Sequence, residues 1–375
     1  MNYIDEFRDG ALAQGLARAI AAEARAQREY HFMEFCGGHT HAIARYGVPG
    51  LLPPNVRMIH GPGCPVCVLP VGRIDQAIRL ALEEKVTLCT YADTMRVPAS
   101  AGLTLQRARA RGADVRMIYA VSDALALARA QPERQVVLFA IGFETTTPPT
   151  AVAVLRAQAE GLKNFSVLCC HVLTPPAMQA ILAAPQVHLD GFVGPAHVST
   201  VIGTRPYEPF AREQGKPVVI AGFEPLDVMQ AILMLIRQVN AGRAEVENEY
   251  TRAVSREGNR KAQALMAEVF ERRDSFEWRG LGELPASALR LRAPYAAFDA
   301  ERRFGLTYQG VPDHKACECA AILRGVKRPA DCKLFGTVCT PDTPMGACMV
   351  SSEGACAAYY SYGRHQAAEG RRGSG

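Results

Sequence analysis

The stretch Gly61-Pro62-Gly63-Cys64-Pro65-Val66-Cys67 lies between a short apolar run, Val56–His60, and a helical pattern that opens at Leu69. Gly-Pro-Gly is typical of a turn, and Gly63 allows the backbone to come close to whatever the thiols face. The stretch therefore predicts a strand, a turn that carries two thiols, and a helix. Backbone N–H groups and the helix dipole at such a turn can lower the pKa of a thiol and make it reactive.

The same alternation of apolar runs and helical patterns continues to about residue 240. Strands are expected at Val56–His60, Val86–Tyr91, Val115–Tyr119, Val136–Ile141, Phe165–Cys170, Leu189–Val193 and Pro217–Ala221. Helices are expected near 73–84, 100–111, 122–130, 150–161, 175–183 and 225–239. Nearly continuous Val, Ile and Leu strands separated by helices indicate βαβ units in parallel sheets that are covered on both faces.

Two strand ends resemble each other. Val137–Glu144 and Val218–Glu224 both end in Gly-Phe-Glu, and each runs into a helix that opens near a proline. A carboxylate at the carboxyl end of a parallel strand faces the usual ligand crevice of an open sheet. We therefore expect an α/β fold with two related parallel-sheet lobes that face each other across a cleft.

A change of character after residue 240 divides the chain further, because charged, Pro-rich and Cys-rich segments follow. The sequence predicts an N-terminal helix that packs on another domain (1–30), a first α/β lobe with Cys36 and Cys64/Cys67 (31–145), a second α/β lobe (146–240), and a helical and loop-rich iron–sulfur domain (241–375). Turns at expected strand ends should bring together five side chains in the cleft: Cys36, His39, Cys64, Cys67 and Glu144.

Composition excludes several classes of function. The 375 residues carry a net charge of only +5 and show no Lys/Arg stripe with interleaved aromatics, so nucleic acid is not an expected partner. The longest apolar stretch, Leu226–Ile236, is too short to span a bilayer, and the N-terminus does not read as a signal peptide. Twelve cysteines without an export signal favour reduced thiols, a metal or redox chemistry in the cytoplasm.

Four late cysteines are separated by six, eight and seven residues: Cys332, Cys339, Cys348 and Cys356. This spacing lacks the Cys-x-x-Cys knuckles of a zinc ribbon, and thiolates on a loop-like segment suit an iron–sulfur cluster. Cys317 and Cys319 lie close by and compete as ligands. The spacing therefore favours a cluster over zinc without fixing which four thiols hold it.

Cys64 and Cys67 allow three interpretations: a redox dithiol, half of a zinc site, or inert core thiols. A zinc site could be completed by Cys36, His39 or His41. Cys36, on a Gly-Gly turn, could equally act as a nucleophile assisted by an imidazole, and His39 could be a hydrogen-bonded structural residue.

Five strings together resemble those of the HypD family of NiFe-hydrogenase maturation proteins, and the similarity runs from about residue 30 to 362. The strings are Phe35-Cys36-Gly37-Gly38-His39-Thr40-His41, Gly61-Pro62-Gly63-Cys64-Pro65-Val66-Cys67, Gly142-Phe143-Glu144-Thr145-Thr146-Thr147-Pro148, Gly194-Pro195-Ala196-His197-Val198-Ser199 and Cys348-Met349-Val350-Ser351-Ser352-Glu353-Gly354.

The resemblance implies a scaffold on which an iron receives two cyanides and one carbon monoxide as transient cargo. Its partners would be a HypC-type chaperone, a HypE-type donor that carries cyanide as a thiocyanate on its C-terminal cysteine, and indirectly the hydrogenase large subunit. Cys36 would bind the iron jointly with a cysteine of the chaperone, with His39 in the immediate shell, and Cys64 and Cys67 would be the redox dithiol. A 4Fe-4S cluster would be held by Cys332, Cys339, Cys348 and Cys356.

Two other classes of function are compatible with the residues alone. One is a free-standing thiol–disulfide oxidoreductase with a structural zinc, and the other is a purely structural adaptor. The first predicts a colourless zinc protein, whereas the scaffold predicts a brown protein after anaerobic purification.

Overall fold

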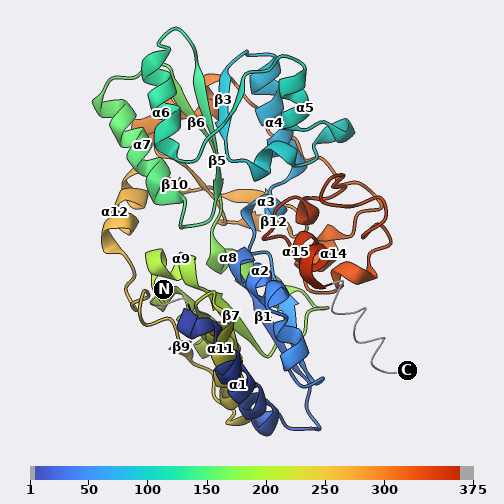
Figure 1. The fold of residues 1–375 in the computed structure, drawn as a ribbon. Coiled ribbons are helices and arrows are strands. Elements are labelled where there is room, and N and C mark those ends of the chain that lie inside the picture. The colour runs from blue at the N-terminus through green and yellow to red at the C-terminus, as the bar shows by residue number, and fades with distance from the viewer. Residues whose placement is uncertain (1–4, 364–375) are drawn as a thin grey trace.

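The computed structural model describes residues 5–363, which contain two parallel β-sheets, one above the other in Figure 1. The first sheet has the order β2-β1-β7-β8-β9 and the second the order β4-β3-β5-β6, and every pairing in both is parallel. The expected α/β class with two parallel sheets is therefore confirmed. The strands are β1 (Tyr30–Glu34), β2 (Val56–His60), β3 (Thr87–Thr90), β4 (Val115–Met117), β5 (Val136–Gly142), β6 (Phe165–His171), β7 (Gly191–Pro195), β8 (Val218–Ala221) and β9 (Val246–Asn248).

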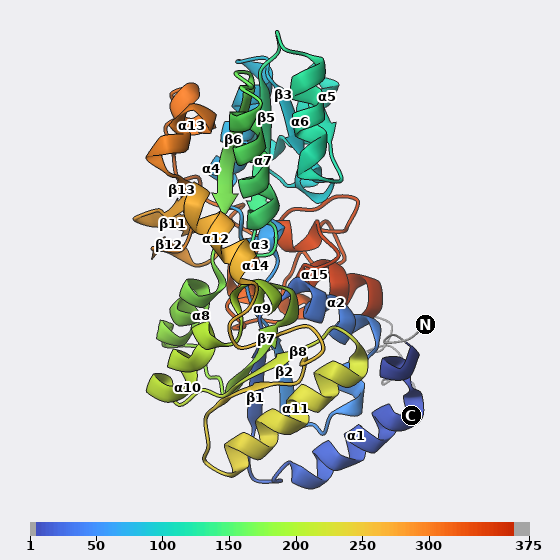
Figure 2. The ribbon, with the colours of Figure 1, turned by 90° about the vertical axis from the view of Figure 1, so that its left-hand side faces the viewer.

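Helices cover the faces of both sheets (Figures 1 and 2). Those of the first sheet's lobe are α1 (Gly10–Glu23), α2 (Gly37–Arg45), α8 (Thr174–Ala183), α9 (Ala196–Ile202), α10 (Glu208–Gln214) and α11 (Pro225–Asn240). Those of the second are α4 (Val71–Leu82), α5 (Leu105–Ala110), α6 (Val121–Ala130) and α7 (Thr147–Ala159). The short α3 (Pro65–Val68) joins the two lobes. Short 3-10 turns include η1 (Asp5–Arg8), η2 (Val48–Leu51), η3 (Asp93–Arg96), η4 (Ser100–Gly102) and η5 (Arg205–Tyr207).

The strands follow the sequence pattern closely. All seven residues of β5 and all seven of β6 are buried, as continuous apolar runs in a doubly covered sheet should be. The expected N-terminal helix ends earlier than residue 30: α1 stops at Glu23 because the chain enters β1 at Tyr30. Asp9 caps α1 by accepting the N–H of Leu12, and the helix packs against α11.

The two sheets interleave along the chain. After β1 and β2 the chain leaves the first sheet through α3, builds the second sheet from β3 to β6, and returns at β7. The expected boundary at residue 145 does not follow the sheets, because β5 and β6, on either side of it, pair directly from Val136↔Phe165 to Gly142↔His171. The expected segments 31–145 and 146–240 thus each supply strands to both sheets.

The similar strand ends lie in different sheets, since Glu144 follows β5 and Glu224 follows β8. One continuous buried apolar cluster fills the junction between the lobes and includes Phe35, Cys67 and Phe143. The helix α3 contacts β5 there. The carboxyl ends of the strands therefore meet across packed side chains.

The C-terminal part combines small antiparallel pairs with loops. The strand β10 pairs with β13, and β11 pairs with β12. The helix α12 contacts both α7 and α9, so it bridges the two lobes. The expected segments 1–30 and 241–375 extend into residues 1–4 and 364–375, which lie outside the described range. The elements are α12 (Arg260–Val269), β10 (Phe270–Arg272), β11 (Ser275–Trp278), β12 (Gly282–Pro285), β13 (Leu289–Leu291), η6 (Ala293–Phe298), α13 (Ala300–Arg303), α14 (Cys319–Leu323), η7 (Pro329–Asp331), η8 (Ala347–Met349), α15 (Ala355–Ala358) and a final π-helical turn (Tyr359–Gly363).

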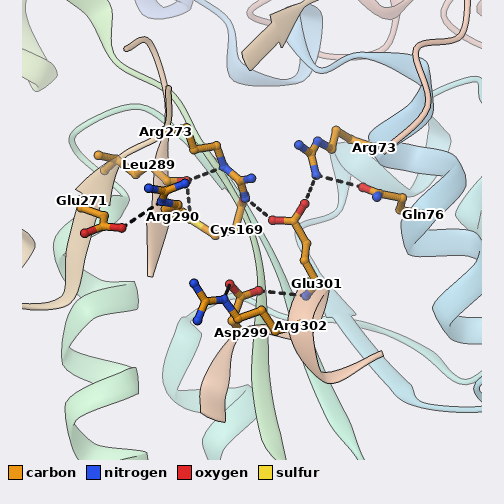
Figure 3. A network of polar contacts seen from close by, with 10 residues as sticks. All are labelled: Arg73, Gln76, Cys169, Glu271, Arg273, Leu289, Arg290, Asp299, Glu301 and Arg302. Carbon is orange, nitrogen blue, oxygen red and sulfur yellow. Dashed lines mark hydrogen bonds and ion pairs between the residues drawn. The ribbon is translucent and has the colours of Figure 1, made fainter. Parts of the chain in front are cut away.

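An ion-pair network attaches this C-terminal part to the second lobe (Figure 3). Glu301 of α13 accepts hydrogen bonds from both Arg73 of α4 and Arg273, which follows β10. Arg273 also donates to the carbonyl oxygens of Cys169 (3.1 Å) and Leu289 (3.0 Å). Both β13 and α13 contact β6, and Figure 2 shows them beside it. The segment from Arg273 to Glu301 is thus tied to the second lobe, whereas the cysteine-bearing η8 and α15 contact α3 and α2.

Candidate metal and thiol site

A buried carboxylate organises the turn that carries Cys36. Glu34, the last residue of β1, accepts the backbone N–H of Cys36 (3.0 Å), the Thr40 hydroxyl and a hydrogen bond from His60 Nδ1 (2.9 Å). Glu34 is completely buried, so these three donors satisfy a group that would otherwise be costly to bury. They fix Cys36 as the N-cap residue of α2.

The Cys36 thiol lies at the N-terminus of α2. Desolvation raises its pKa, and the nearby Glu353 carboxylate raises it further, while hydrogen bonds from the backbone N–H groups of Gly38 and His39 act in the opposite direction. Cys36 itself remains partly exposed. A helix N-terminus stabilises an anion, so this position suits a thiolate once a metal ion has displaced the proton.

His39 faces away from the thiol and toward the first sheet. Its Nε2 lies 3.0 and 2.9 Å from the backbone oxygens of Ala221 and Gly222 at the end of β8, and it must donate because carbonyl oxygens only accept. The ring contacts Phe223 at 4.8 Å between centroids. Burial lowers the His39 pKa and favours the neutral imidazole, whose Nδ1 has no hydrogen-bond partner within residues 5–363.

The turn with the two closely spaced thiols packs directly against the Cys36 turn. The carbonyl oxygen of Gly63 accepts the N–H of Gly37 at 3.2 Å. Cys64 caps α3, and its Sγ accepts the N–H of Cys67 at 3.4 Å. The structure therefore brings Cys36 and the Cys64–Cys67 pair together, as the strand-end argument expected.

A chain of thiol contacts leads from this turn into the C-terminal part. Cys348 is completely buried, and its thiol lies close enough to those of Cys67, Cys319 and Cys356 for them to influence its pKa. Cys319 interacts in the same way with Cys317. These five thiols come from α3, the segment before α14, α14, η8 and α15, so side chains far apart in the sequence meet at one place.

The four cysteines expected as cluster ligands are not equally placed. Cys348 and Cys356 belong to the chain of thiol contacts, and Cys339 lies beside it, with its Sγ accepting the N–H of Met345 at 3.4 Å. Cys332 is partly exposed; its N–H donates to the carbonyl oxygen of Pro329, and its own carbonyl oxygen accepts the N–H of Phe335. Across residues 5–363, no three His, Cys, Asp or Glu side chains are arranged as ligands of a single metal ion.

Glu144 lies at the N-terminus of α8. Both of its oxygens are engaged by Thr174, one by the backbone N–H (2.8 Å) and one by the hydroxyl (2.9 Å). Burial raises the Glu144 pKa to about 7, although these hydrogen bonds oppose the shift. The buried Tyr207 hydroxyl lies 3.2 Å from that of Ser199, and burial together with the charges of Glu144 and Cys36 raises the Tyr207 pKa. Glu144 thus borders the junction without contacting the cysteines.

A small cavity of about 300 Å³ opens beside α2. Its walls include Gly38, His41, Phe223 and Glu353, so it adjoins the Cys36 turn. A second molecule can therefore approach this turn from the surface.

Comparisons with known proteins place the chain in a family. A family model described as "HypD: Hydrogenase formation hypA family" matches residues 11–363. The chain belongs to the HypD family. It is 70% identical over 370 residues to "Hydrogenase maturation factor HypD" of Cupriavidus necator, covering 97% of this chain and 98% of that protein. It is 67% identical to the protein of the same name from Rhizobium leguminosarum bv. viciae (97% and 96% covered) and 46% identical to that of Escherichia coli K12 (98% and 100% covered).

Several residues of the site were not predicted from the sequence. Glu34 and Glu353 stand beside and within strings that carried the resemblance; Glu34 lies two residues before Cys36 in the sequence, whereas Glu353 comes near Cys36 only in the fold. Cys319 was noted only as a competing ligand, yet it contacts Cys348, Cys356 and Cys317. The position of Cys319 depends on how the irregular loops fold, and the spacing of cysteines in the sequence does not encode this. Within residues 5–363, no helix is long and apolar enough to cross a membrane.

Proposed function

We propose that the chain is the cytoplasmic scaffold on which the Fe(CN)2CO unit of NiFe-hydrogenase is assembled, together with a HypC-type chaperone. The observation that carries the proposal is the direct packing of the Cys36 turn on the Cys64–Cys67 turn, with Gly37 N–H donating to Gly63 oxygen at 3.2 Å. A soft thiolate ligand and a pair of reducing thiols are the two functions that such an assembly needs in one place.

Cys36 is the proposed ligand of the cargo iron, shared with a cysteine of the chaperone. The two N–H groups of Gly38 and His39 compensate the negative charge of the coordinated sulfur, and the cavity beside α2 offers the chaperone an approach. The imidazole of His39 is held by β8 and positions α2. The backbone N–H of His39 positions the cargo.

Cys64 and Cys67 are the proposed two-electron reductant for cyanide release. One thiolate attacks the sulfur of a thiocyanate on a HypE-type donor, and cyanide leaves with the electron pair of the broken S–C bond. The second thiol then attacks the mixed disulfide and its proton passes to the donor's sulfur, so the products are a Cys64–Cys67 disulfide, the donor's free thiol and cyanide, while the proton lost when the first thiol ionised goes to solvent. Both thiols start reduced. They give up two electrons when they form the disulfide, and cleavage of the S–C bond takes up the same two electrons.

The C-terminal thiols are the proposed site of a 4Fe-4S cluster. Their chemistry fits, because Cys317, Cys319, Cys339, Cys348 and Cys356 gather on irregular backbone and thiolates are the usual ligands of such clusters. When bound, the cluster would supply single electrons for returning the disulfide to thiols. Cys332 remains a proposed ligand with Cys339, Cys348 and Cys356. For Glu144, the two bonds to Thr174 favour a positioning role at the lobe junction.

The test is the Cys36→Ala variant, purified anaerobically as the complex with the chaperone. We expect its infrared spectrum to lose the iron-bound cyanide and carbon monoxide bands, whereas the cluster absorption should survive because it depends on other thiols. Cys89→Ala is the matched control, since Cys89 is a buried core thiol of β3. A Cys36→Ala complex with the full set of bands would disprove the iron-ligand role.

A further inference from the structure

A cavity of about 1120 Å³ lies between the second lobe and the C-terminal part. One wall is formed by η4 and α5, and the other by the loops 311–315 and 341–345. We call it the basic cavity. It lies away from the Cys36 turn, and the proposed assembly reaction makes no use of it.

The side chains of the basic cavity carry an excess of positive charge. Four cationic residues line it against two carboxylates, Asp313 and Asp342, and the cations are Arg96, Arg107, Arg279 and Lys315. Arg96 is committed to the carbonyl oxygens of Pro341 and Val350. Arg107 and Lys315 are exposed residues at the cavity wall, and Arg107 also donates from Nη1 to the carbonyl oxygen of Gly102.

Arg279 provides the strongest indication of a ligand. Its side chain is only 2% exposed, and its Nε lies 3.1 Å from an Asp313 oxygen. Its Nη2 has no hydrogen-bond partner anywhere in the described part of the chain. A buried guanidinium N–H without a partner is costly, so the cavity contains an unmet demand for an anionic acceptor.

We propose that the basic cavity binds a small organic oxyanion, a carboxylate or a phosphate, with the guanidinium of Arg279 as its buried anchor. A guanidinium matches the paired oxygens of both groups, and Arg107 and Lys315 lie at the cavity wall to complete the charge. Apolar residues such as Val71, Pro98 and Met345 line the rest, so the ligand carries an apolar part as well. The volume is that of a site for a metabolite-sized molecule.

The floor of the basic cavity connects it to the C-terminal thiols. Met345, which lines the cavity, donates its N–H to Cys339 Sγ at 3.4 Å. The next residue, Gly346, packs so closely on Cys317 and Cys319 that a Cβ there would lie 2.3 and 2.6 Å from their sulfur atoms. A bound oxyanion would therefore lie one residue away from the thiols.

Calorimetric titration of the full-length protein with citrate and, separately, with inorganic phosphate tests the proposal, with ionic strength held constant by sodium chloride. We expect saturable binding of one equivalent of at least one probe. Arg107→Gln/Lys315→Gln should weaken it by about tenfold or more, because each lost charge removes a charge-assisted hydrogen bond. The control is Arg205→Gln/Lys261→Gln, which removes the same charge outside the cavity.

Every outcome of the titration either supports or overturns the proposed oxyanion site. Binding of citrate alone identifies a carboxylate ligand, and binding of phosphate alone identifies a phosphate ligand; either result supports the site if only the cavity variant is weakened. The proposal is overturned if neither probe saturates, or if the control variant loses affinity as much as the cavity variant. Both changed residues in the cavity variant are exposed, so the fold should be unaffected, and circular dichroism verifies this.

Discussion

The Cys36 thiol is subject to opposing influences that together suit a metal ligand. Desolvation and the Glu353 carboxylate raise its pKa, while the N–H groups of Gly38 and His39 lower it. The free residue is therefore a neutral thiol at physiological pH. Binding of a divalent metal displaces that proton, and the same N–H groups then stabilise the anion that remains. The turn thus keeps the sulfur protonated, and protected from reaction, as long as no metal ion displaces the proton.

Glu144 makes the stability of the protein depend on pH. Burial raises its pKa from 4.5 to about 7. Below about pH 4.5 both the folded and the unfolded state hold the proton; as the pH rises toward 7, only the unfolded state loses it, so stability falls. Across this window the loss is about 3 kcal/mol. Glu144→Gln cannot ionise and keeps both contacts with Thr174, so urea unfolding at pH 5 to 8 should show the wild type losing stability relative to the variant.

An exposed carboxylate provides the control for this pH series. Glu29 lies on the surface, 3.5 Å from Arg57. Glu29→Gln should therefore leave the pH dependence as it is in the wild type. If the Glu144→Gln and wild-type curves ran parallel between pH 5 and 8, Glu144 would have to be ionised throughout, and the effect of burial would be refuted.

At the level of the elements, the turn that carries Cys36 and the turn that carries Cys64 and Cys67 are in direct backbone contact. This contact leaves no room for a side chain at Gly63. A Cβ at Gly63 would lie 2.3 Å from Cys36 N and 2.5 Å from Cys36 Cα, and backbone atoms cannot rotate out of the way. Gly63→Ala should separate the turns and destabilise the protein by about 1–3 kcal/mol. Hydrogen exchange at the Gly37 amide, which donates to Gly63, should accelerate.

Gly15 in the middle of α1 is the matched control, because nothing lies within 4 Å of its added Cβ. Gly15→Ala should stabilise the protein by up to about 1 kcal/mol, since alanine favours the helix. Equal effects of the two substitutions on urea unfolding would show that the close packing of the two turns does not matter.

Most elements could be predicted from the sequence because their signals are local. The buried runs of β5 and β6 are continuous and apolar, and both were expected within a residue of their observed bounds. The strand β1 was missed because His31 and Glu34 interrupt its short pattern, and Glu34 is buried only because Cys36, Thr40 and His60 supply donors. A buried carboxylate inside a short strand breaks the apolar pattern, and one of its donors, His60, comes from the neighbouring strand β2.

For the whole molecule, the sequence predicted two parallel sheets but not which strands each contains. The order β2-β1-β7-β8-β9 joins strands more than 130 residues apart, and the choice is made by packing between lobes. The site, too, could be predicted only in part from the sequence. Strand ends brought Cys36 and Cys64 together as expected, whereas the contact of Cys67 with Cys348 depends on how the C-terminal loops dock.

Docking of the C-terminal part should depend on Glu301, which joins Arg73 and Arg273 (Figure 3). Burial opposes ionisation of Glu301, but the two guanidinium groups outweigh it and lower its pKa. Glu301→Gln would leave both cations without a counter-charge while their side chains stay 6% and 14% exposed. We expect a loss of about 3–5 kcal/mol in urea unfolding and faster proteolysis between residues 270 and 303.

The control for this network is Glu160→Gln, which breaks an ion pair with Arg129 whose two side chains are 38% and 42% exposed. Water screens an exposed pair, so this change should be nearly silent. The triple variant Arg73→Met/Arg273→Met/Glu301→Leu removes all three charges together and should recover much of the stability lost by Glu301→Gln. If Glu301→Gln were as mild as Glu160→Gln, the packing of β13 and α13 on β6 would have to hold the C-terminal part in place without the network.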